Sequence, residues 1–340
     1  MVTKRHFGVT RNGEDVYAYT LENDRGISVT VLDYGATLQS VVLTHKGERI
    51  DVVLGYDTIG EYENNDGYLG ASIGRFAGRI PDSQLRIGDD VCPVTTNEGK
   101  NQLHGGACGF DKRVWQFAPS QIPFERENSV RFRLHSVHGE EGYPCGADFD
   151  VTYLLNCRSL CIRFHGRYDH SDGSHLETVT AWNPTNHAYW NLNGHDAGSV
   201  LNHRLEIPAD RYVPVGPDMI PTGGEADVTG TRFDFRSMRA IESAYDHSFV
   251  LSGDPIRLWG NRGIGMEIET DCKAVQLYTA EHLSERKGKG GAAYRPFGAV
   301  CLEAEGRQTM RGSSIAEENV LLKRSALNER EILFKFYTEE

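Results

Sequence analysis

The chain has 340 residues, with 36 basic against 48 acidic side chains and a formal net charge of −12. Such a charge repels phosphate backbones and anionic lipid surfaces, so we expect neither nucleic acid nor a membrane as a partner. No apolar run approaches the roughly 20 residues of a membrane span, and the polar first residues do not form a signal peptide. The seven scattered cysteines include no CxxC pair, which indicates reduced thiols and a cytoplasmic protein.

Apolar and polar residues alternate along most of the apolar segments, which is the pattern of half-buried strands. This pattern predicts strands over residues 27–32, 52–54, 130–134, 149–155, 160–164, 264–268, 275–278 and 332–337. Only residues 57–64 and 281–286 have helical character, and we expect short connecting helices there. No repeat or linker divides the chain. The sequence therefore predicts an all-β fold of packed, mostly antiparallel sheets, in a single domain over residues 1–340.

Two features are similar to cofactor or metal sites only superficially. Residues 287–291 are basic and rich in glycine, but no strand precedes them and no helix follows, so we interpret them as a mobile basic loop. The remaining candidates are histidines whose spacing does not gather them around a metal: His165, His170 and His175, or His135 and His138. We therefore predict no metal site and no cofactor.

Two other histidines stand in surroundings that suit a ligand. His104 is followed by Gly105-Gly106, and paired glycines let the backbone approach a bound molecule closely. His187 is flanked by Asn186 and by Tyr189-Trp190, which offer amide hydrogen bonds and the flat apolar faces that pack on a sugar ring. Either histidine by itself is more often a hydrogen-bonded structural residue than a ligand-binding one, so a site depends on the whole set.

A buried strand is predicted over residues 298–305, and it ends in two carboxylates. Glu303 and Glu305 are two positions apart and so point to the same face of that strand. Like charges placed this way raise the pKa of one carboxyl, which makes it a usable base near neutral pH. The alternative is a strand end that reaches solvent, with both carboxylates hydrated.

Several motifs along the chain resemble, in order, those of the aldose 1-epimerase (galactose mutarotase) family. They are residues 34–38 (YGATL), 51–56 (DVVLGY), 74–80 (GRFAGRI), 102–106 (QLHGG), 185–192 (TNHAYWNL), 221–223 (PTG), 245–249 (YDHSF), 275–279 (VQLYT) and 301–303 (CLE). Each motif alone is weak. Their number and order make the resemblance specific over essentially the whole chain.

The resemblance implies a β-supersandwich that interconverts the α and β anomers of a small aldose without metal or organic cofactor, as a monomer or homodimer. It assigns Glu303 as the general base and His187 as the general acid. The residues expected to hold the sugar are His104, Arg79, Asp246 and Gln276. Because the acid and base are far apart in sequence, we expect the fold to place them in one cleft, on opposite sides of a sugar-sized space.

The chain also departs from the family pattern beside the expected base. Gly78 replaces a usual asparagine, and Glu305 replaces a usual glutamine and is followed by Gly306-Arg307 and Arg311 instead of Pro-Asp. We hypothesise that this new charge moves sugar preference away from plain galactose or glucose. The alternative is that these residues belong to a variable exterior loop.

Three other functions remain open from the sequence. A non-catalytic sugar-binding protein would not need both His187 and Glu303. An epimerase for a phosphorylated hexose would need several arginines around the phosphate, for which Arg79, Arg307 and Arg311 are the candidates. A glycoside hydrolase would need two suitably spaced carboxylates, such as Asp246 with Glu303.

Overall fold

The computed structural model describes residues 2–120, 128–169, 179–307, 314–315, 320–323 and 328–339. Within these ranges the regular secondary structure is almost entirely strand, with one short α-helix, α1 (Ile59–Glu63), and a few 3₁₀ turns. This confirms the predicted all-β fold. No helix in the described ranges is long and apolar enough to cross a membrane.

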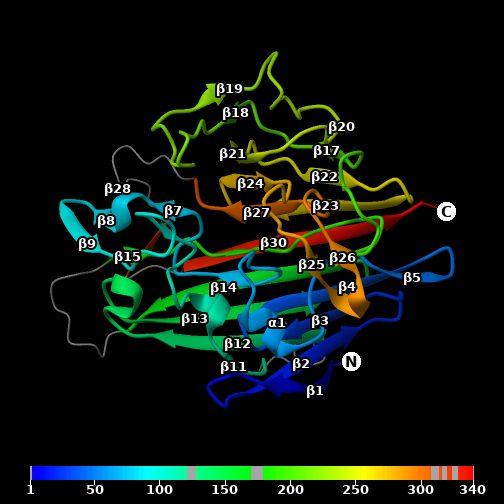
Figure 1. Ribbon diagram of the computed structural model, residues 1–340, viewed down its shortest axis with the longest axis horizontal. Coiled ribbons are helices and arrows are strands. Elements are labelled where there is room, and N and C mark those ends of the chain that lie inside the picture. The colour runs from blue at the N-terminus through cyan, green and yellow to red at the C-terminus, as the bar shows by residue number, and fades with distance from the viewer. Residues whose placement is uncertain are drawn as a thin grey trace.

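The largest sheet has nine strands and forms the middle of the molecule (Figure 1). In spatial order its strands are β11 (Gln116–Phe117), β12 (Ser129–Ser136), β13 (Ala147–Leu155), β14 (Ser159–Tyr168), β30 (Asn328–Thr338), β23 (Ile264–Thr270), β22 (Ile256–Trp259), β17 (Arg204–Glu206) and β20 (Arg239–Ala240). The long strand β30, in red, crosses the middle of Figure 1 and joins the β11–β14 half to the β17–β23 half. All the pairings in this sheet are antiparallel.

A five-stranded sheet at the N-terminus packs against the nine-stranded sheet. Its strands are β1 (Val2–Val9), β2 (Asp15–Glu22), β3 (Ser28–Leu32), β4 (Thr37–His45) and β5 (Glu48–Asp51). Alternate residues of the two sheets, such as Val29 and Val31 on one and Phe132 and Val151 on the other, meet in a single hydrophobic core. Trp190 is fully buried in this core, with its ring centroid 5.0 Å from that of Phe334.

A second five-stranded sheet carries residues of the predicted site. Its strands are β19 (Ala226–Asp227), β18 (Arg211–Tyr212), β21 (Asp246–Val250), β24 (Ala274–Tyr278) and β27 (Cys301–Glu305). Short pairings complete the fold: β6 (Ser72–Ile73) with β16 (Thr185–Asn186), β7 (Arg79–Ile80) with β10 (Gln102–Leu103), β8 (Gln84–Ile87) with β9 (Asp90–Pro93) and β28 (Ser314–Ile315), β15 (Val179–Ala181) with β29 (Leu321–Lys323), and β25 (Arg286–Lys287) with β26 (Ala293–Tyr294).

Three local predictions were wrong or imprecise. The helix expected over residues 57–64 is shorter: α1 is capped by Thr58, whose side chain forms a capping box with Glu61. Residues 281–286 form no helix: they begin with a turn at 281–282 and reach strand β25 at Arg286. Residues 52–54 contribute only an isolated bridge between Val53 and Trp190.

The basic stretch at residues 287–291 is anchored rather than free. The Lys289 side chain is buried, and its Nζ donates to Asp51 Oδ2 at 2.6 Å and to the carbonyl of Gln39 at 2.8 Å. Burial lowers the pKa of Lys289, and the charge of Asp51 opposes that shift. The interpretation of this segment as a mobile loop was therefore wrong; its lysine ties the β25–β26 hairpin to the N-terminal sheet.

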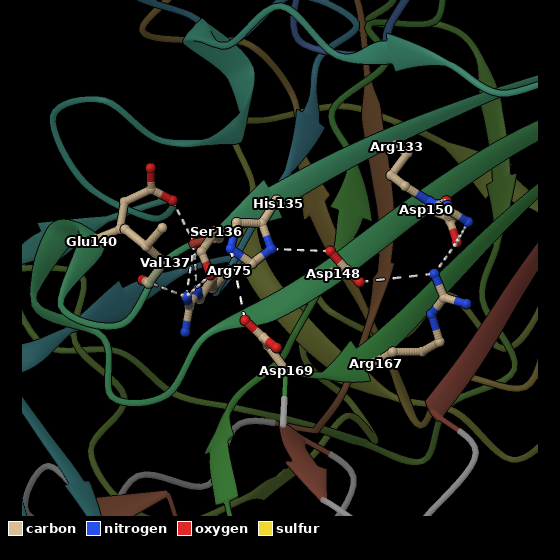
Figure 2. Close-up of polar contacts among 10 residues, drawn as sticks. All are labelled: Arg75, Arg133, His135, Ser136, Val137, Glu140, Asp148, Asp150, Arg167 and Asp169. Atoms are coloured by element: carbon tan, nitrogen blue, oxygen red, sulfur yellow. Dashed lines mark hydrogen bonds and ion pairs between the residues drawn. The ribbon is translucent and has the colours of Figure 1, made fainter. Parts of the chain in front are cut away.

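The outer face of the nine-stranded sheet is polar (Figure 2). There His135 lies 3.0 Å from Asp148 and 3.9 Å from Asp169, and the carboxylate of Asp150 accepts hydrogen bonds from Arg133 and Arg131. His138 accepts a hydrogen bond from a backbone N–H, and His165 lies 3.2 Å from Glu329, so these histidines have protein partners. His170 and His175 lie outside the described residues.

Candidate active site

One face of strands β21, β24 and β27 is lined with polar side chains, although the strands themselves are buried. The register pairs Ser248 with Gln276 and Gln276 with Glu303. Because side chains alternate along a strand, the polar set shares one face, and the apolar residues between its members enter the main core. The polar set is Asp246, Ser248, Gln276, Tyr278, Glu303 and Glu305.

His187 follows strand β16 and is held rigidly by its backbone. Its N–H donates to the carbonyl of Ala71 at 2.9 Å, and its carbonyl accepts from the N–H of Gly70 at 2.9 Å. The side chain of Asn186 adds hydrogen bonds to the carbonyl of Gly70 and to the hydroxyl of Tyr153. Both backbone groups of the predicted acid are thus paired, which fixes the direction of its ring.

His104 follows strand β10 and is fixed by Gly78. The backbone N–H of His104 donates to the Gly78 carbonyl at 3.0 Å, and the Gly78 N–H donates to His104 Nδ1 at 3.2 Å. Nδ1 is therefore an acceptor, and the neutral ring carries its proton on Nε2. Gly105 and Gly106 serve packing rather than ligand approach, because a Cβ on them would meet the carbonyl oxygen of Gly74 and the carboxylate of Glu141.

A cavity of about 350 Å³ brings together all six predicted site residues, which come from six separate segments of the chain. They are Arg79, His104, His187, Asp246, Gln276 and Glu303. The mouth is bordered by Asp66 and Arg286, which lie 2.6 Å apart, and by the apolar side chains of Met219 and Pro221. An open cavity with a polar interior and a mixed polar and apolar rim suits a small, hydroxyl-rich molecule.

Glu303 and His187 are direct neighbours in this cavity. Glu303 Oε1 lies 3.6 Å from His187 Nε2, and both side chains are almost fully buried. The shared cleft agrees with the sequence-based expectation, but the placement on opposite sides of a sugar-sized space was wrong. The physical reason is that the segment carrying His187 packs directly against β27, where Thr185 Oγ1 donates to the carbonyl of Ala304 at 2.9 Å, so the two side chains emerge next to each other.

Burial moves the two groups towards their uncharged forms. It raises the pKa of Glu303 well above the usual value, with the charges of Glu305 and Asp246 adding to the shift and that of Arg79 opposing it. It lowers the pKa of His187 to about 4. The contact at 3.6 Å is too long for a hydrogen bond.

The remaining predicted residues are held by partners in the same cavity. Arg79 forms a bidentate pair with Glu98, through Nε at 2.7 Å and Nη2 at 2.8 Å, so its Nη1 faces no acceptor within the described ranges. Gln276 Nε2 donates to Asp246 Oδ1 at 2.5 Å. These contacts orient a guanidinium, a carboxylate and an amide before any ligand arrives.

His104, His187 and Glu303 also offer potential metal-ligand atoms within 4.8 Å of one another. The donor chemistry does not favour a metal, however. The lone pair of His104 Nδ1 accepts the Gly78 N–H, and the proton of the neutral ring then occupies Nε2. Neither nitrogen of His104 has a free lone pair in this arrangement, so the cluster is better suited to proton transfer than to metal binding.

The sequence did not single out several residues of the cavity. Tyr68 packs edge-on to His104 at 4.8 Å between ring centroids, and Tyr278 closes the wall beside Gln276. The sequence could have pointed to Tyr278, because it lies two positions from Gln276 on the same strand and so faces the same side. Tyr68 lies in a loop, where no local pattern identifies a cavity residue. Tyr189 does stack on His187 at 5.0 Å, whereas Trp190 belongs to the core and not to the site.

The charged residues that depart from the family pattern differ in where they lie. Glu305 is 4% exposed and lines the cavity, so it is not part of an exterior loop. Arg307 does not line the cavity and instead pairs with Glu225. Arg311 lies outside the described residues. Of the charged departures that the structure describes, only Glu305 is placed to affect a bound molecule.

Comparisons with known proteins show the family of the chain. The aldose 1-epimerase family profile matches residues 17–306. The aldose 1-epimerase of Haemophilus influenzae is 34% identical over 312 residues, covering 86% of this chain and 87% of that protein. Human galactose mutarotase is 33% identical over 321 residues, covering 89% of this chain and 90% of its own length.

Solved structures show the same fold. The galactose 1-epimerase of Lactobacillus acidophilus superimposes with a TM-score of 0.85 at 27% identity, covering 100% of this chain and 99% of that one. The aldose epimerase homologue of C. elegans gives a TM-score of 0.84 at 30% identity, covering 94% and 98% of the two chains. The chain belongs to the aldose 1-epimerase family of isomerases.

Proposed function

We propose that this protein interconverts the α and β anomers of a free aldose, with Glu303 as the base and His187 as the acid. The observation that carries the proposal is the contact between Glu303 Oε1 and His187 Nε2, 3.6 Å apart in a buried cavity. A proton acceptor and a proton donor that lie side by side match the two oxygens of one anomeric carbon. Simple sugar binding has no need for such a pair.

The proposed reaction exchanges only protons with the protein. Glu303 takes the proton from the anomeric hydroxyl, the bond between C1 and the ring oxygen breaks, and His187 delivers a proton to that ring oxygen. The product is the open-chain aldehyde. Rotation about the C1–C2 bond presents the other carbonyl face, and reclosure with the two residues in reversed roles gives the other anomer and restores both protonation states.

Four further residues are proposed to hold the sugar. Arg79, oriented by Glu98, and His104, with its proton on Nε2, are donors to sugar oxygens. Asp246 and Gln276 already share a hydrogen bond and accept from and donate to hydroxyl groups. Tyr68 and Tyr189 supply flat walls beside them.

The charge of the cavity favours a neutral sugar over a phosphorylated one. Two arginines, Arg79 and Arg286, are among its lining residues, and each is already paired with a carboxylate. The acidic lining residues are Asp66, Glu98, Asp246, Glu303 and Glu305. A phosphate in this cavity would face a surplus of negative charge without a free cluster of cations.

Polarimetry tests the proposal. Freshly dissolved α-D-galactose, α-D-glucose, xylose, arabinose and fucose are followed to anomeric equilibrium with and without protein, and acceleration of at least one is expected. A rate led strongly by galactose would contradict the hypothesis that Glu305 changes sugar preference. No acceleration of any free sugar would contradict the proposed function. Cleavage of a nitrophenyl galactoside would support a hydrolase instead.

A further inference from the structure

Glu305 is a second buried carboxylate beside the proposed base. Strand β27 places Glu303 and Glu305 on one face, about 7 Å apart along the strand, and both line the cavity. They are 3% and 4% exposed. Two carboxylates this close, with little water around them, do not readily ionise together, so the surroundings of each decide which one keeps its charge.

The surroundings of Glu305 favour its charged form. Asn183 Nδ2 lies 3.4 Å from Glu305 Oε2, and Ser248 Oγ lies 3.5 Å from Oε1, both as donors. Behind Asn183, the guanidinium of Arg330 is 5% exposed and donates from Nη1 to Asn183 Oδ1 at 2.6 Å. Burial lowers the pKa of Arg330, and Cys272, Glu305 and Asp271 oppose that shift. A buried cation of this kind needs an anion nearby.

The backbone next to Glu305 is shaped for this arrangement. The N–H of Gly306 donates to Asn183 Oδ1 at 2.7 Å, the same oxygen that Arg330 binds. A Cβ on Gly306 would lie 2.8 Å from Arg330 Nη2 and 2.5 Å from a methyl carbon of Val320. Glu305 and Gly306, which both depart from the family pattern, therefore contribute to one structural unit with Asn183 and Arg330.

The surroundings of Glu303 are different, because cations are scarce around it. Arg79 is the cation that acts on it, and Arg79 is already paired with Glu98. Several other titratable groups face Glu303. They are His187 after β16, Asp246 on β21, Tyr278 on β24, Tyr189, and, on the same strand as Glu303, Cys301 and Glu305. Burial lowers the pKa of His187, so desolvation opposes a positive charge on this neighbour.

We propose that Glu305 is a positioning residue that acts through electrostatics: it stays ionised against Asn183 and Arg330, and its fixed negative charge makes Glu303 the stronger proton acceptor. This inference rests on the proposed function and deepens it. Glu305 does not exchange a proton with the sugar. The same charge repels an anionic ligand, so the site selects neutral aldoses over phosphorylated sugars and sugar acids.

A fixed negative charge beside Glu303 and His187 shifts the pH dependence of the activity in a direction that follows from electrostatics. It increases the proton affinity of Glu303 and of His187 alike, because both gain a proton in a negative field. Activity requires one proton on the pair, and it falls when that proton is lost at high pH or a second is gained at low pH. Removal of the charge therefore moves both limbs of the pH–rate profile in the same direction, towards lower pH.

The test is the pH–rate profile of Glu305→Gln, measured by polarimetry on the best sugar. We expect both limbs to move down by about one to two pH units, which is the effect of one charge at this distance. Glu305→Asp, which keeps the charge, should restore the wild-type position. Glu267→Gln is the matched control, since Glu267 is partly buried on β23 with Arg257 and Lys335 and lies outside the cavity. An unmoved profile in Glu305→Gln would overturn the proposal.

A second measurement separates this proposal from the proposed function. Carbon-13 NMR of glutamate carboxyl groups in the full-length protein follows Glu303 and Glu305 directly, with each signal assigned by its loss in the corresponding glutamine variant. In the wild type we expect Glu305 to remain ionised at a pH where Glu303 is already protonated. The reverse order would overturn the proposal even if mutarotation is found. If no aldose is turned over, this titration order still tests the charge division.

Discussion

Glu303 and His187 lie side by side at the bottom of one cavity, 3.6 Å apart between Oε1 and Nε2, although 116 positions separate them in the chain. Different parts of the structure position the two residues. The register of β24 and β27 sets Glu303 opposite Gln276, whereas His187 is fixed by backbone hydrogen bonds to residues 70–71. The chemistry proposed for the protein depends on this single contact.

Replacement of either member of the pair should remove most of the activity. We expect Glu303→Gln and His187→Asn each to lower kcat by about 10²–10⁴, the usual contribution of a positioned acid or base. The double variant should be little worse than the worse single variant, because the two residues act as a unit. Polarimetry with Glu267→Gln as the control measures this. Full additivity of the two losses would contradict a shared reaction step.

Loss of the Glu98 carboxylate should weaken substrate binding more than turnover. Glu98 holds Arg79 through two hydrogen bonds at 2.7 and 2.8 Å, and in Glu98→Gln the guanidinium is free to leave the orientation that faces the sugar. We expect KM to rise by up to about tenfold, the worth of one charged hydrogen bond. Initial rates over a range of sugar concentrations separate KM from kcat. A fall in kcat at unchanged KM would contradict a binding role for Arg79.

Gly105 should tolerate no side chain, because it supports the backbone of His104. A Cβ at Gly105 (φ +87°) would lie 2.0 Å from the carbonyl oxygen of Gly74, whereas at Gly13 (φ +83°) it would meet nothing within 4 Å. Both alanine variants carry the strain of a positive φ, about 1–2 kcal/mol. Gly105→Ala should lose at least about 2 kcal/mol more, from the steric clash. Urea unfolding compares the two, and equal losses would contradict the close approach.

Acid should destabilise the fold through His203, which lies away from the site. Its ring is fully buried, its Nε2 accepts the N–H of Leu192 at 3.0 Å, and burial lowers its pKa from 6.5 to about 4. Between these two pH values the unfolded chain binds a proton that the folded protein does not. The contribution of His203 to the free energy of unfolding is therefore fully present above pH 6.5. This contribution is lost as the pH falls towards 4, by at most about 3 kcal/mol.

Urea unfolding of wild type and His203→Gln at pH 7 and pH 4.5 checks this prediction. Glutamine still accepts the Leu192 N–H but does not titrate, so the variant should lose less stability on acidification than the wild type does. An identical pH dependence of the two proteins would contradict the buried, neutral state of His203.

Much of the fold was predictable because alternation of apolar and polar residues survives in most strands. The segments at residues 149–155, 264–268 and 332–337 all lie within strands of the nine-stranded sheet. The same signal failed at residues 52–54, where a short apolar run is buried as an isolated bridge. The helical pattern at 281–286 was also misleading, because this segment turns at 281–282 and pairs as strand β25 from Arg286.

The candidate site was predictable as a set of residues but not as a geometry. Gln276 and Glu303 come from motifs in the sequence, and the structure brings them opposite each other on neighbouring strands. The roles of Glu98 and Tyr68 depend on loops whose course no local pattern encodes. The partner of Glu305 was equally hidden, since Arg330 reaches it from β30 at the far end of the chain.

The most direct test of the account is the mutarotation rate of α-D-galactose with wild-type protein, with Glu303→Gln and with no protein, in one buffer near neutral pH. Acceleration by the wild type, with the Glu303→Gln rate reduced to near that of buffer alone, is the predicted result. A Glu303→Gln protein that is folded and accelerates mutarotation as fast as the wild type would contradict Glu303 as the base and, with it, the proposed use of the Glu303–His187 contact.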